Sequence, residues 1–332
     1  MIAINTIGFL EGVGLGLVLA IVLFVVDYSR INPVKHALTG TTFHSNVTRP
    51  YQHQELLRQK GDSLHILELQ GFVFFGTTQR VLDLARQRID NGNLPPVRFL
   101  VLDFRAVKGF DSSAALGFEK MKQLTRARAI TLVLTHLSPQ IQRQIRVVLR
   151  EGEKDTKVFA DLDHGIEWCE DQIIVTSASP DSRAEHLTMM RQLEESLPSS
   201  VTSADVMAYF EDKRAEKGEY LIRQGDDSAL YLIETGKVTV QLECADGKII
   251  RLRTIRSGTV VGELGLYLGR KASASVIADE SCKFFYLAPK KLREMEDNAP
   301  EIASAFHKFV GRILSERLID TNDALEALTR SQ

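Results

Sequence analysis

The spacing of apolar positions changes several times along the chain, and the first stretch is apolar almost throughout. Residues 7–26 contain a single charged side chain, Glu11. Because about 20 apolar residues can cross a bilayer as a helix, we predict one transmembrane helix over residues 5–27. Arg30 and Lys35 follow this stretch and no Lys or Arg precedes it, so we expect the long C-terminal part to be cytoplasmic. A cleaved signal peptide would need a basic start and a small-residue cleavage site, and neither is visible.

Residues 28–62 are polar and predict a linker, after which short apolar runs alternate with amphipathic runs over residues 63–175. Short apolar runs bounded by turn residues are typical of buried strands, and apolar positions three and four apart are typical of helices. Strands are predicted at residues 64–69, 73–75, 99–104, 130–134 and 158–159, and helices at residues 77–89, 112–125, 138–150 and 163–173. This alternation predicts an α/β domain with a mostly parallel sheet.

The last two segments are a linker with one helix, over residues 176–204, and a domain over residues 205–322. In that domain short apolar runs recur between glycines, a pattern typical of antiparallel rolls and barrels. Strands are predicted at residues 220–223, 229–234, 237–243, 249–255 and 275–278, followed by helices at residues 293–298 and 301–318. The predicted fold class is therefore multi-domain: one transmembrane helix, an α/β domain, and a β-roll with flanking helices.

The composition and the absence of certain motifs argue against several kinds of partner and of reaction. The net charge of -2 argues against a large basic surface, so nucleic acid is not an expected partner. The three cysteines are far apart in sequence, which argues against a disulfide framework and a zinc site. The chain shows no P-loop, nucleophile elbow, His-Glu-x-x-His motif or paired catalytic carboxylates. We therefore expect that it is not an enzyme and that it holds neither a metal nor a resident cofactor.

Three stretches carry a resemblance to a known family. Val101-Leu-Asp-Phe104, followed by Gly109-Phe-Asp-Ser-Ser-Ala114, resembles the signature of the STAS domain. The apolar stretch together with Leu69-Gln-Gly-Phe-Val-Phe-Phe-Gly76 is similar to the last membrane helix and linker of bacterial SulP anion transporters. The resemblance implies transport of anions such as sulfate or bicarbonate, with the other SulP transmembrane helices as partners. One span cannot form an anion pathway, so we expect a truncated or split chain.

Ser112 has two interpretations within this signature. In the related anti-sigma-factor antagonists, the first Ser after the Asp is phosphorylated, and Ser112 occupies that position. Asp111 is predicted to be a helix N-cap, which places Ser112 in the first turn, where a phosphate would meet the positive end of the helix dipole. Alternatively, Asp111, Ser112 and Ser113 only satisfy the N–H groups of a helix start.

The β-roll segment resembles the cyclic nucleotide-binding domain. The matching stretches are Lys217-Gly-Glu219, Arg223-Gln-Gly-Asp226, Leu230-Tyr-Leu-Ile233, Gly236-Lys-Val238 and Gly262-Glu-Leu-Gly-Leu266. The resemblance implies that Glu263 binds the ribose 2′-hydroxyl and that an Arg in the following loop pairs with the cyclic phosphate. In this chain Ala272 stands at the position of that Arg. Losing the Arg would weaken nucleotide binding by roughly 10- to 150-fold.

The candidate ligand-binding residues belong to this one loop. Backbone N–H groups and small side chains can hold a phosphate, and two adjacent cations could reach it from neighbouring positions. The candidates are Gly262, Glu263, Leu264, Gly265, Arg270, Lys271, Ser273, Ala274 and Ser275. Cyclic AMP or cyclic GMP is the expected effector. The alternative is a roll that is kept for its fold and contacts and binds no ligand.

The pattern and the two resemblances together predict the cytoplasmic regulatory region of a SulP-type anion transporter at a membrane. The alternative is a stand-alone, membrane-anchored signalling module that binds a cyclic nucleotide or a partner protein and is switched at Ser112. A second copy of the chain, forming a homodimer, is a further candidate partner.

Overall fold

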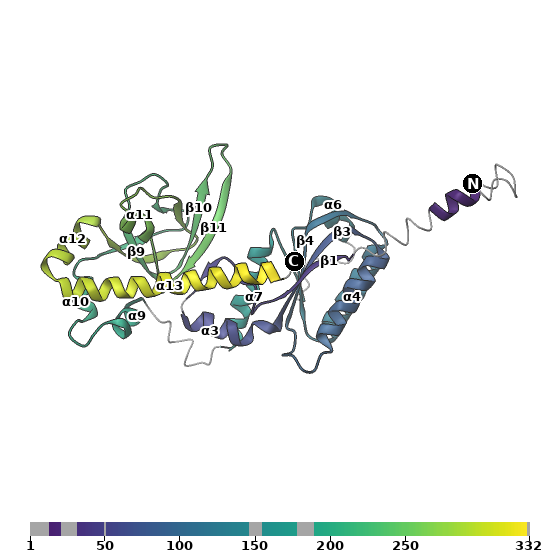
Figure 1. The fold of residues 1–332 in the computed structure, drawn as a ribbon, viewed down its shortest axis with the longest axis horizontal. Coiled ribbons are helices and arrows are strands. Elements are labelled where there is room, and N and C mark those ends of the chain that lie inside the picture. Colours follow the sequence, from purple (N-terminus) through teal and green to yellow (C-terminus); the bar gives the residue numbers. More distant parts are fainter. Residues whose placement is uncertain (1–12, 21–31, 50, 146–154, 178–188, 331–332) are drawn as a thin grey trace. The chain divides into compact units, whose positions relative to one another are not determined.

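The computed structural model describes residues 13–20, 32–49, 51–145, 155–177 and 189–330 (Figure 1). The chain divides into two compact units, one formed by Met1–Thr39 and Asp62–Gly165 and the other by Gly40–Gly61 and Ile166–Gln332. In the part of the chain that is described, no helix has the length and apolar character to span a bilayer. Most of the span predicted over residues 5–27 lies outside the described residues, and residues 13–20 of it are helical.

The first unit is an α/β domain on a five-stranded sheet, as the alternating pattern predicted. The strand order is β1-β3-β4-β5-β6, in which β1 runs antiparallel to β3 and the other neighbours are parallel. Parallel neighbours need long crossover connections, which the intervening helices supply. The strands are β1 (Val34–Thr39), β3 (Leu64–Val73), β4 (Phe99–Phe110), β5 (Thr131–Thr135) and β6 (Thr156–Phe159).

Three helices share one hydrophobic core with this sheet: α4 (Phe75–Ile89), α5 (Ala114–Ala127) and α6 (Pro139–Ile145). Leu82 of α4 and Phe118 of α5 lie in that core with Leu100 and Leu102 of β4. Residues two apart in a strand project to the same face of the sheet, so both leucines meet the helices. Each such side chain, when fully buried, contributes about 1.5–3 kcal/mol, which holds the helices on the sheet.

Two boundaries in the first unit differ from the prediction for local reasons. The helix predicted to begin at residue 77 begins at Phe75 with Phe74 as its N-cap, so Thr77 lies inside α4. The Thr77 hydroxyl accepts the Phe74 N–H at 2.8 Å, so it supports the cap from the third helical position. Strand β3 runs without a break from Leu64 to Val73, and the last two residues of the strand predicted at residues 73–75 are the N-cap and the first residue of α4. Gly71 has a φ of 75°, which lets the strand bend while it stays paired with β4.

The second unit is a β-roll of two sheets, as predicted from the glycine-punctuated runs. One sheet has the order β2-β11-β10-β13-β8, and the other has the order β12-β9-β14-β7. Figure 1 shows β10 and β11 as the long hairpin of this unit. The strands are β2 (Val47–Thr48), β7 (Glu211–Ala215), β8 (Tyr220–Ile222), β9 (Leu230–Thr235), β10 (Lys237–Glu243), β11 (Ile249–Arg256), β12 (Thr259–Val261), β13 (Ser275–Ala278) and β14 (Cys282–Leu287).

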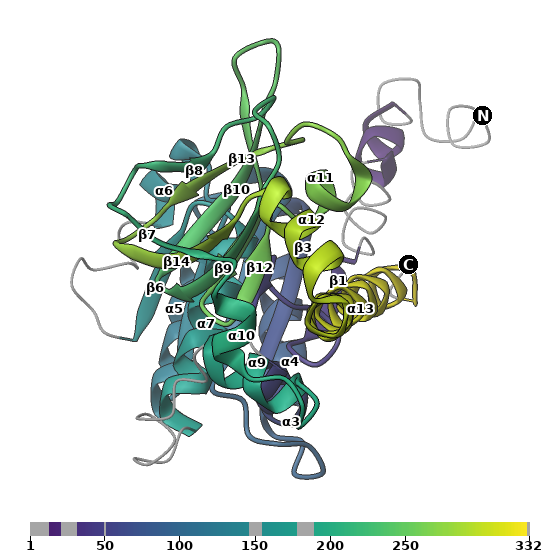
Figure 2. The same cartoon turned by 90° about the vertical axis from the view of Figure 1, so that its left-hand side faces the viewer.

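Helices cover the second of these sheets. α9 (Met189–Ser196), α10 (Ser203–Met207), α12 (Pro289–Asn298) and α13 (Pro300–Arg330) contribute side chains to one core with β9 and β12. α9, α10 and α12 all contact α13, which Figure 2 shows nearly end-on. Phe306 and Phe309 of α13 are almost completely buried there. The helix extends well past residue 318, where its apolar spacing predicted an end.

Part of the predicted linker belongs to the roll. β2 pairs in parallel with β11 through Val47 and Thr48, and α3 (Tyr51–Lys60) follows it. From Ile166 onward, α7 (Leu162–Ser177) also belongs to the second unit. The second unit is therefore assembled from two separate stretches of the chain. The predicted domain limits at residues 63, 176 and 205 stay predictions.

Candidate functional site

A cavity of about 630 Å³ lies within the β-roll. Its walls come from β11, β12, α11 (Glu263–Leu268), residues 272–274 and α13. Most of the lining side chains are apolar, and the ionisable ones are Arg253, Glu263 and Arg317. A mostly apolar pocket with a few converging polar groups is typical of small-molecule sites. This cavity is called the roll cavity below.

Gly262 fixes where the first polar group stands. Its φ of 86° is left-handed, and a Cβ there would come within 2.1 Å of the Ala229 carbonyl oxygen. Both conditions restrict the position to glycine. The turn starts α11 directly after β12, so Glu263 occupies the first helical position and its side chain enters the cavity. The Gly-Glu pair singled out in the sequence thus has a geometric cause.

The Glu263 carboxylate is paired with an arginine from the C-terminal helix. Arg317 Nη1 donates to Glu263 Oε1 at 2.9 Å, and both side chains are largely buried. Arg317 Nη2 also donates to Thr259 Oγ1 at 2.6 Å and to the Val260 carbonyl oxygen. Burial lowers the pKa of the Arg317 guanidinium, and the neighbouring Glu263 carboxylate opposes that shift. The pair therefore joins α13 to the start of α11.

Six of the nine predicted ligand-binding residues line the roll cavity: Gly262, Glu263, Leu264, Gly265, Ser273 and Ala274. Ala272, at the position of the expected phosphate-binding Arg, lines it as well. The structure thus brings the glycine turn and the small loop residues to one cavity. Whether they bind a ligand stays a prediction.

The other three predicted residues lie elsewhere. Lys271 is exposed, with its Nζ 3.4 Å from Asp227 Oδ1, and Arg270 is absent from the cavity lining. Neither cation therefore replaces the missing arginine in this structure. The Ser275 hydroxyl is buried and donates to Glu243 Oε1 at 2.7 Å. Residues along a strand alternate between faces, which turns Ser275 away while Ala274 faces the cavity.

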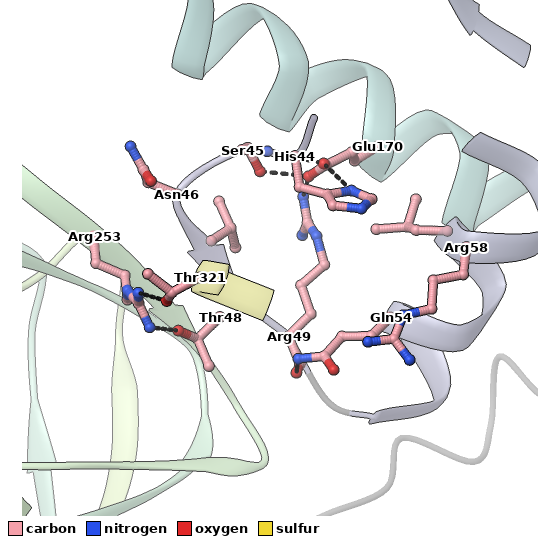
Figure 3. Close-up of a pocket in the computed structure, with 12 residues that line it drawn as sticks. His44, Ser45, Asn46, Thr48, Arg49, Gln54, Arg58, Glu170, Arg253 and Thr321 are labelled. Carbon is pink, nitrogen blue, oxygen red and sulfur yellow. Dashed lines mark hydrogen bonds and ion pairs between the residues drawn. The ribbon is translucent and has the colours of Figure 1, made fainter. Parts of the chain in front are cut away.

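Arg253 is a cavity residue that the sequence reasoning missed. Its guanidinium donates to Thr48 Oγ1 at 3.3 Å and to Thr321 Oγ1 at 3.5 Å (Figure 3). Within the described residues it forms no ion pair. It was missed because β11 carries three arginines, Arg251, Arg253 and Arg256, and the sequence alone does not say which one faces inward.

Arg253 and Thr321 also line a second, smaller cavity of about 140 Å³, drawn in Figure 3. Glu170 Oε2 accepts Arg49 Nη2 there at 2.8 Å, and Glu170 also accepts the Ser45 N–H at 3.0 Å and the Ser45 hydroxyl. Burial alone would raise the pKa of Glu170, but Arg49 and the hydrogen bonds from His44 and Ser45 lower it to about 2. Arg49 and Glu170 thus form a buried ion pair between the β2 segment and α7.

The β10–β11 hairpin is joined to α7 by further ion pairs. Glu167 lies 2.7 Å from Arg251 Nη2 and 3.5 Å from Lys237 Nζ. Arg256 contacts the carboxylates of both Glu167 and Asp171. Burial alone would raise the pKa of Glu167, but the hydrogen bond from Arg251 and the neighbouring cations outweigh burial and lower it. These contacts place acidic groups of α7 against basic groups of the hairpin.

Ser112 lies in the first unit, at an exposed turn before α5. Asp111 Oδ1 accepts the Ser113 N–H at 2.6 Å, and this hydrogen bond lowers the pKa of Asp111. Ser113, not Asp111, is the N-cap, so Ser112 precedes the first helical turn that the sequence assigned to it. The Asp111 side chain thus forms a turn that spans Ser112, and the helix begins at Ala114 instead of residue 112. Phosphorylation of Ser112 stays a prediction.

The family comparisons identify both domains. The STAS domain matches residues 56–162, and the cyclic nucleotide-binding domain matches residues 212–298. The chain therefore contains a STAS domain followed by a cyclic nucleotide-binding domain. The first unit carries nearly all of one match, and the roll with its cavity carries the other.

The relatives that match this chain include a transporter and two glutaminases. The vacuolar basic amino acid transporter VSB1 of Saccharomyces cerevisiae is 27% identical over 60% of this chain and 19% of its own length. Glutaminase 2 of Bradyrhizobium diazoefficiens is 26% identical over 86% of this chain and 44% of its own length. Glutaminase 1 of the same organism is 27% identical over 86% of this chain and 45% of its own length. The chain thus spans less than half the length of each of these relatives.

The glutaminase matches contradict the expectation that this chain is not an enzyme. They extend over 86% of the chain, so enzymatic activity belongs among the functions to be tested. The sequence reasoning failed here because it searched for a few motifs, each of which marks only certain reaction classes. The match to the vacuolar transporter covers 19% of that protein and does not show the SulP family.

Proposed function

We propose that this chain is a regulatory region of a SulP-type anion transporter and that its roll cavity binds a cyclic nucleotide. The observation that carries the proposal is the roll cavity itself: a buried carboxylate, Glu263, beside a glycine turn and the small residues Ser273 and Ala274. Such a carboxylate accepts hydroxyl protons, and backbone N–H groups beside small side chains accommodate a phosphate. Those two groups suit the two ends of a ribose phosphate.

The transporter part of the proposal draws on two supports. The match to the vacuolar transporter covers 60% of this chain, and the apolar stretch over residues 5–27 has the length of a membrane span. In this proposal the chain is held at a membrane beside further SulP helices, with sulfate or bicarbonate as the transported class. Anion uptake by vesicles containing those helices, with and without this chain, tests this part. Equal uptake would count against it.

Ligand binding can be measured directly on the full chain. We expect cyclic AMP or cyclic GMP to raise the unfolding temperature of the roll, and the rise to grow with ligand concentration. The ligand range should extend to millimolar, because Ala272 replaces the expected arginine. As a control, adenosine lacks the phosphate and should give a smaller rise. An unchanged unfolding temperature at every nucleotide concentration would refute the sensor function.

The glutaminase relatives favour a second candidate, in which the chain is the regulatory part of a glutamine-hydrolysing protein. Release of ammonia from glutamine by the purified chain, with and without cyclic nucleotide, tests it. Activity that increases with nucleotide would support this candidate. If the chain and a boiled sample release ammonia equally, the chain itself does not catalyse the reaction.

A further inference from the structure

The pairing of three strands places Arg253 on one side of the roll cavity. Val240 of β10 pairs with Arg253 on β11 and with Val276 on β13, and all three residues line the cavity. Residues directly opposite each other in a sheet project to the same face. Neighbouring strands are about 4.8 Å apart, so Arg253 lies roughly 10 Å across the cavity floor from Val276.

The proposed phosphate-binding groups are on the opposite side of this floor. Residues 272–274 directly precede β13, so Ser273 and Ala274 lie at the β13 side. Arg317 and Thr321 are one turn apart on α13: Arg317 holds Glu263, and Thr321 accepts a hydrogen bond from Arg253. Ser273 and Ala274 thus lie on the β13 side of the cavity and Arg253 on the β11 side. A nucleotide whose phosphate lies at Ser273 and Ala274 would extend its base towards Arg253.

The chemistry of Arg253 distinguishes between bases. A guanidinium carries only hydrogen-bond donors. Its two contacts, with the hydroxyls of Thr48 and Thr321, are at the long end of the hydrogen-bond range, and it forms no ion pair within the described residues. Guanine presents two acceptors, O6 and N7, to which an arginine binds bidentately, whereas adenine presents an amino donor in place of O6. A donor-only group therefore matches guanine and opposes adenine.

We propose that Arg253 is the base-recognising residue of the roll cavity and that it makes the cavity select cyclic GMP over cyclic AMP. This inference rests on the proposed function, because it requires that a cyclic nucleotide binds in the roll cavity. The competing account is that Arg253 only connects β2 to α13 through its two threonine partners. In that case its replacement would alter stability but leave the ratio of the two affinities unchanged.

The test is calorimetric titration of the full chain with cyclic GMP and cyclic AMP. We expect the wild type to bind cyclic GMP about tenfold or more tightly than cyclic AMP. Arg253→Gln should reduce or reverse that ratio, because a glutamine amide offers a donor and an acceptor and so matches adenine. Arg214→Gln is the matched control, since Arg214 is exposed on β7, outside the cavity lining, and this variant should keep the wild-type ratio.

Each outcome separates the two proposals. If both nucleotides bind the wild type equally, or if Arg253→Gln keeps the wild-type ratio, the base-recognition role is overturned while nucleotide binding stands. If neither nucleotide binds the wild type, both proposals fail. The ratio is measured within each variant, so partial loss of folded protein does not mimic the effect. Should Arg253→Gln not fold, Arg253→Lys keeps the charge but loses the bidentate geometry, and the ratio should still fall.

Discussion

The carboxylate of Glu263 has two tasks in the roll cavity. It accepts Arg317 at 2.9 Å, and it is the acceptor that a sugar hydroxyl would use. A carboxylate has about four acceptor sites, so the ion pair orients the group and leaves sites open. The sequence pointed to Glu263 through its resemblance to the cyclic nucleotide-binding domain. It could not point to Arg317, which is 54 residues away and reaches the cavity only through the packing of α13.

Replacing Glu263 by Gln should lower the free energy of unfolding of the unliganded protein by about 3–5 kcal/mol. The reason is that the Arg317 guanidinium stays buried without its counter-charge. Denaturant unfolding measures the change, and Glu119→Gln, at an exposed position on α5, serves as the control. Adding Arg317→Met to Glu263→Gln should restore part of the loss. Equal stability of Glu263→Gln and the wild type would contradict this account of the pair.

At the scale of elements, strands with a clear hydrophobic pattern were predictable and strands fixed by pairing were not. β10 and β13 coincide with their predicted limits. β7 reads EDKRA, and its strand conformation comes from pairing with β14 along its whole length. β2 has only two residues and is defined by its partner β11. The hydrophobic pattern of a strand indicates which of its own side chains are buried. Strand pairing depends instead on residues far away in the sequence.

The docking of α7 depends on a buried charge, so it should respond to pH. The pKa of Glu170 is about 2 in the folded protein, below the ordinary value near 4.5 of an unfolded chain. Its contribution, about 3 kcal/mol, is therefore present above pH 4.5 and is lost as the pH falls from 4.5 through 2. Glu170→Gln should destabilise the second unit at pH 7 by about this amount, and the difference from wild type should shrink towards pH 2.

Urea unfolding at pH 7 and pH 3, followed by the fluorescence of Trp168, the chain's single tryptophan, measures this effect within α7 itself. Glu119→Gln is again the control and should follow the wild type at both values of pH. A destabilisation of the same size at pH 7 and pH 3 would show that lost hydrogen bonds, and not the charge, account for the effect.

At the scale of the whole molecule, the two domains were recognisable in the sequence. Which stretches of the chain form the second unit was not. The polar residues 28–62 gave no sign that Arg49 would pair with Glu170, because the two residues are 121 positions apart. The acidic positions of α7 likewise gave no sign of their partners on β11, since solvated helix faces carry the same residue types. Long-range charge pairing has no local signature, so only the folded chain reveals it.

A fragment of residues 189–332 should therefore be a poor substitute for the roll in the intact chain. It lacks Glu167 and Asp171, which removes the ion pairs of Arg251 and Arg256 with α7, and it lacks β2, which leaves β11 as an open edge. We expect the fragment to unfold at least about 5 °C below the roll of the intact chain. Thermal melts at several protein concentrations measure this and also detect edge association. Equal unfolding temperatures would show that these contacts add no stability.

The assembly of the second unit from two stretches also sets an order of events during protein synthesis. Thr48 leaves the ribosome 205 residues before Arg253, its partner on β11. At 5–20 residues per second, the β2 segment waits roughly 10–40 s for the strand on which it docks. All strands of the first unit have been made before that interval ends, so this unit can fold while β2 is still unpaired. The roll is completed last, whereas Arg49 and Ser45 lack their partner only until Glu170 has been made.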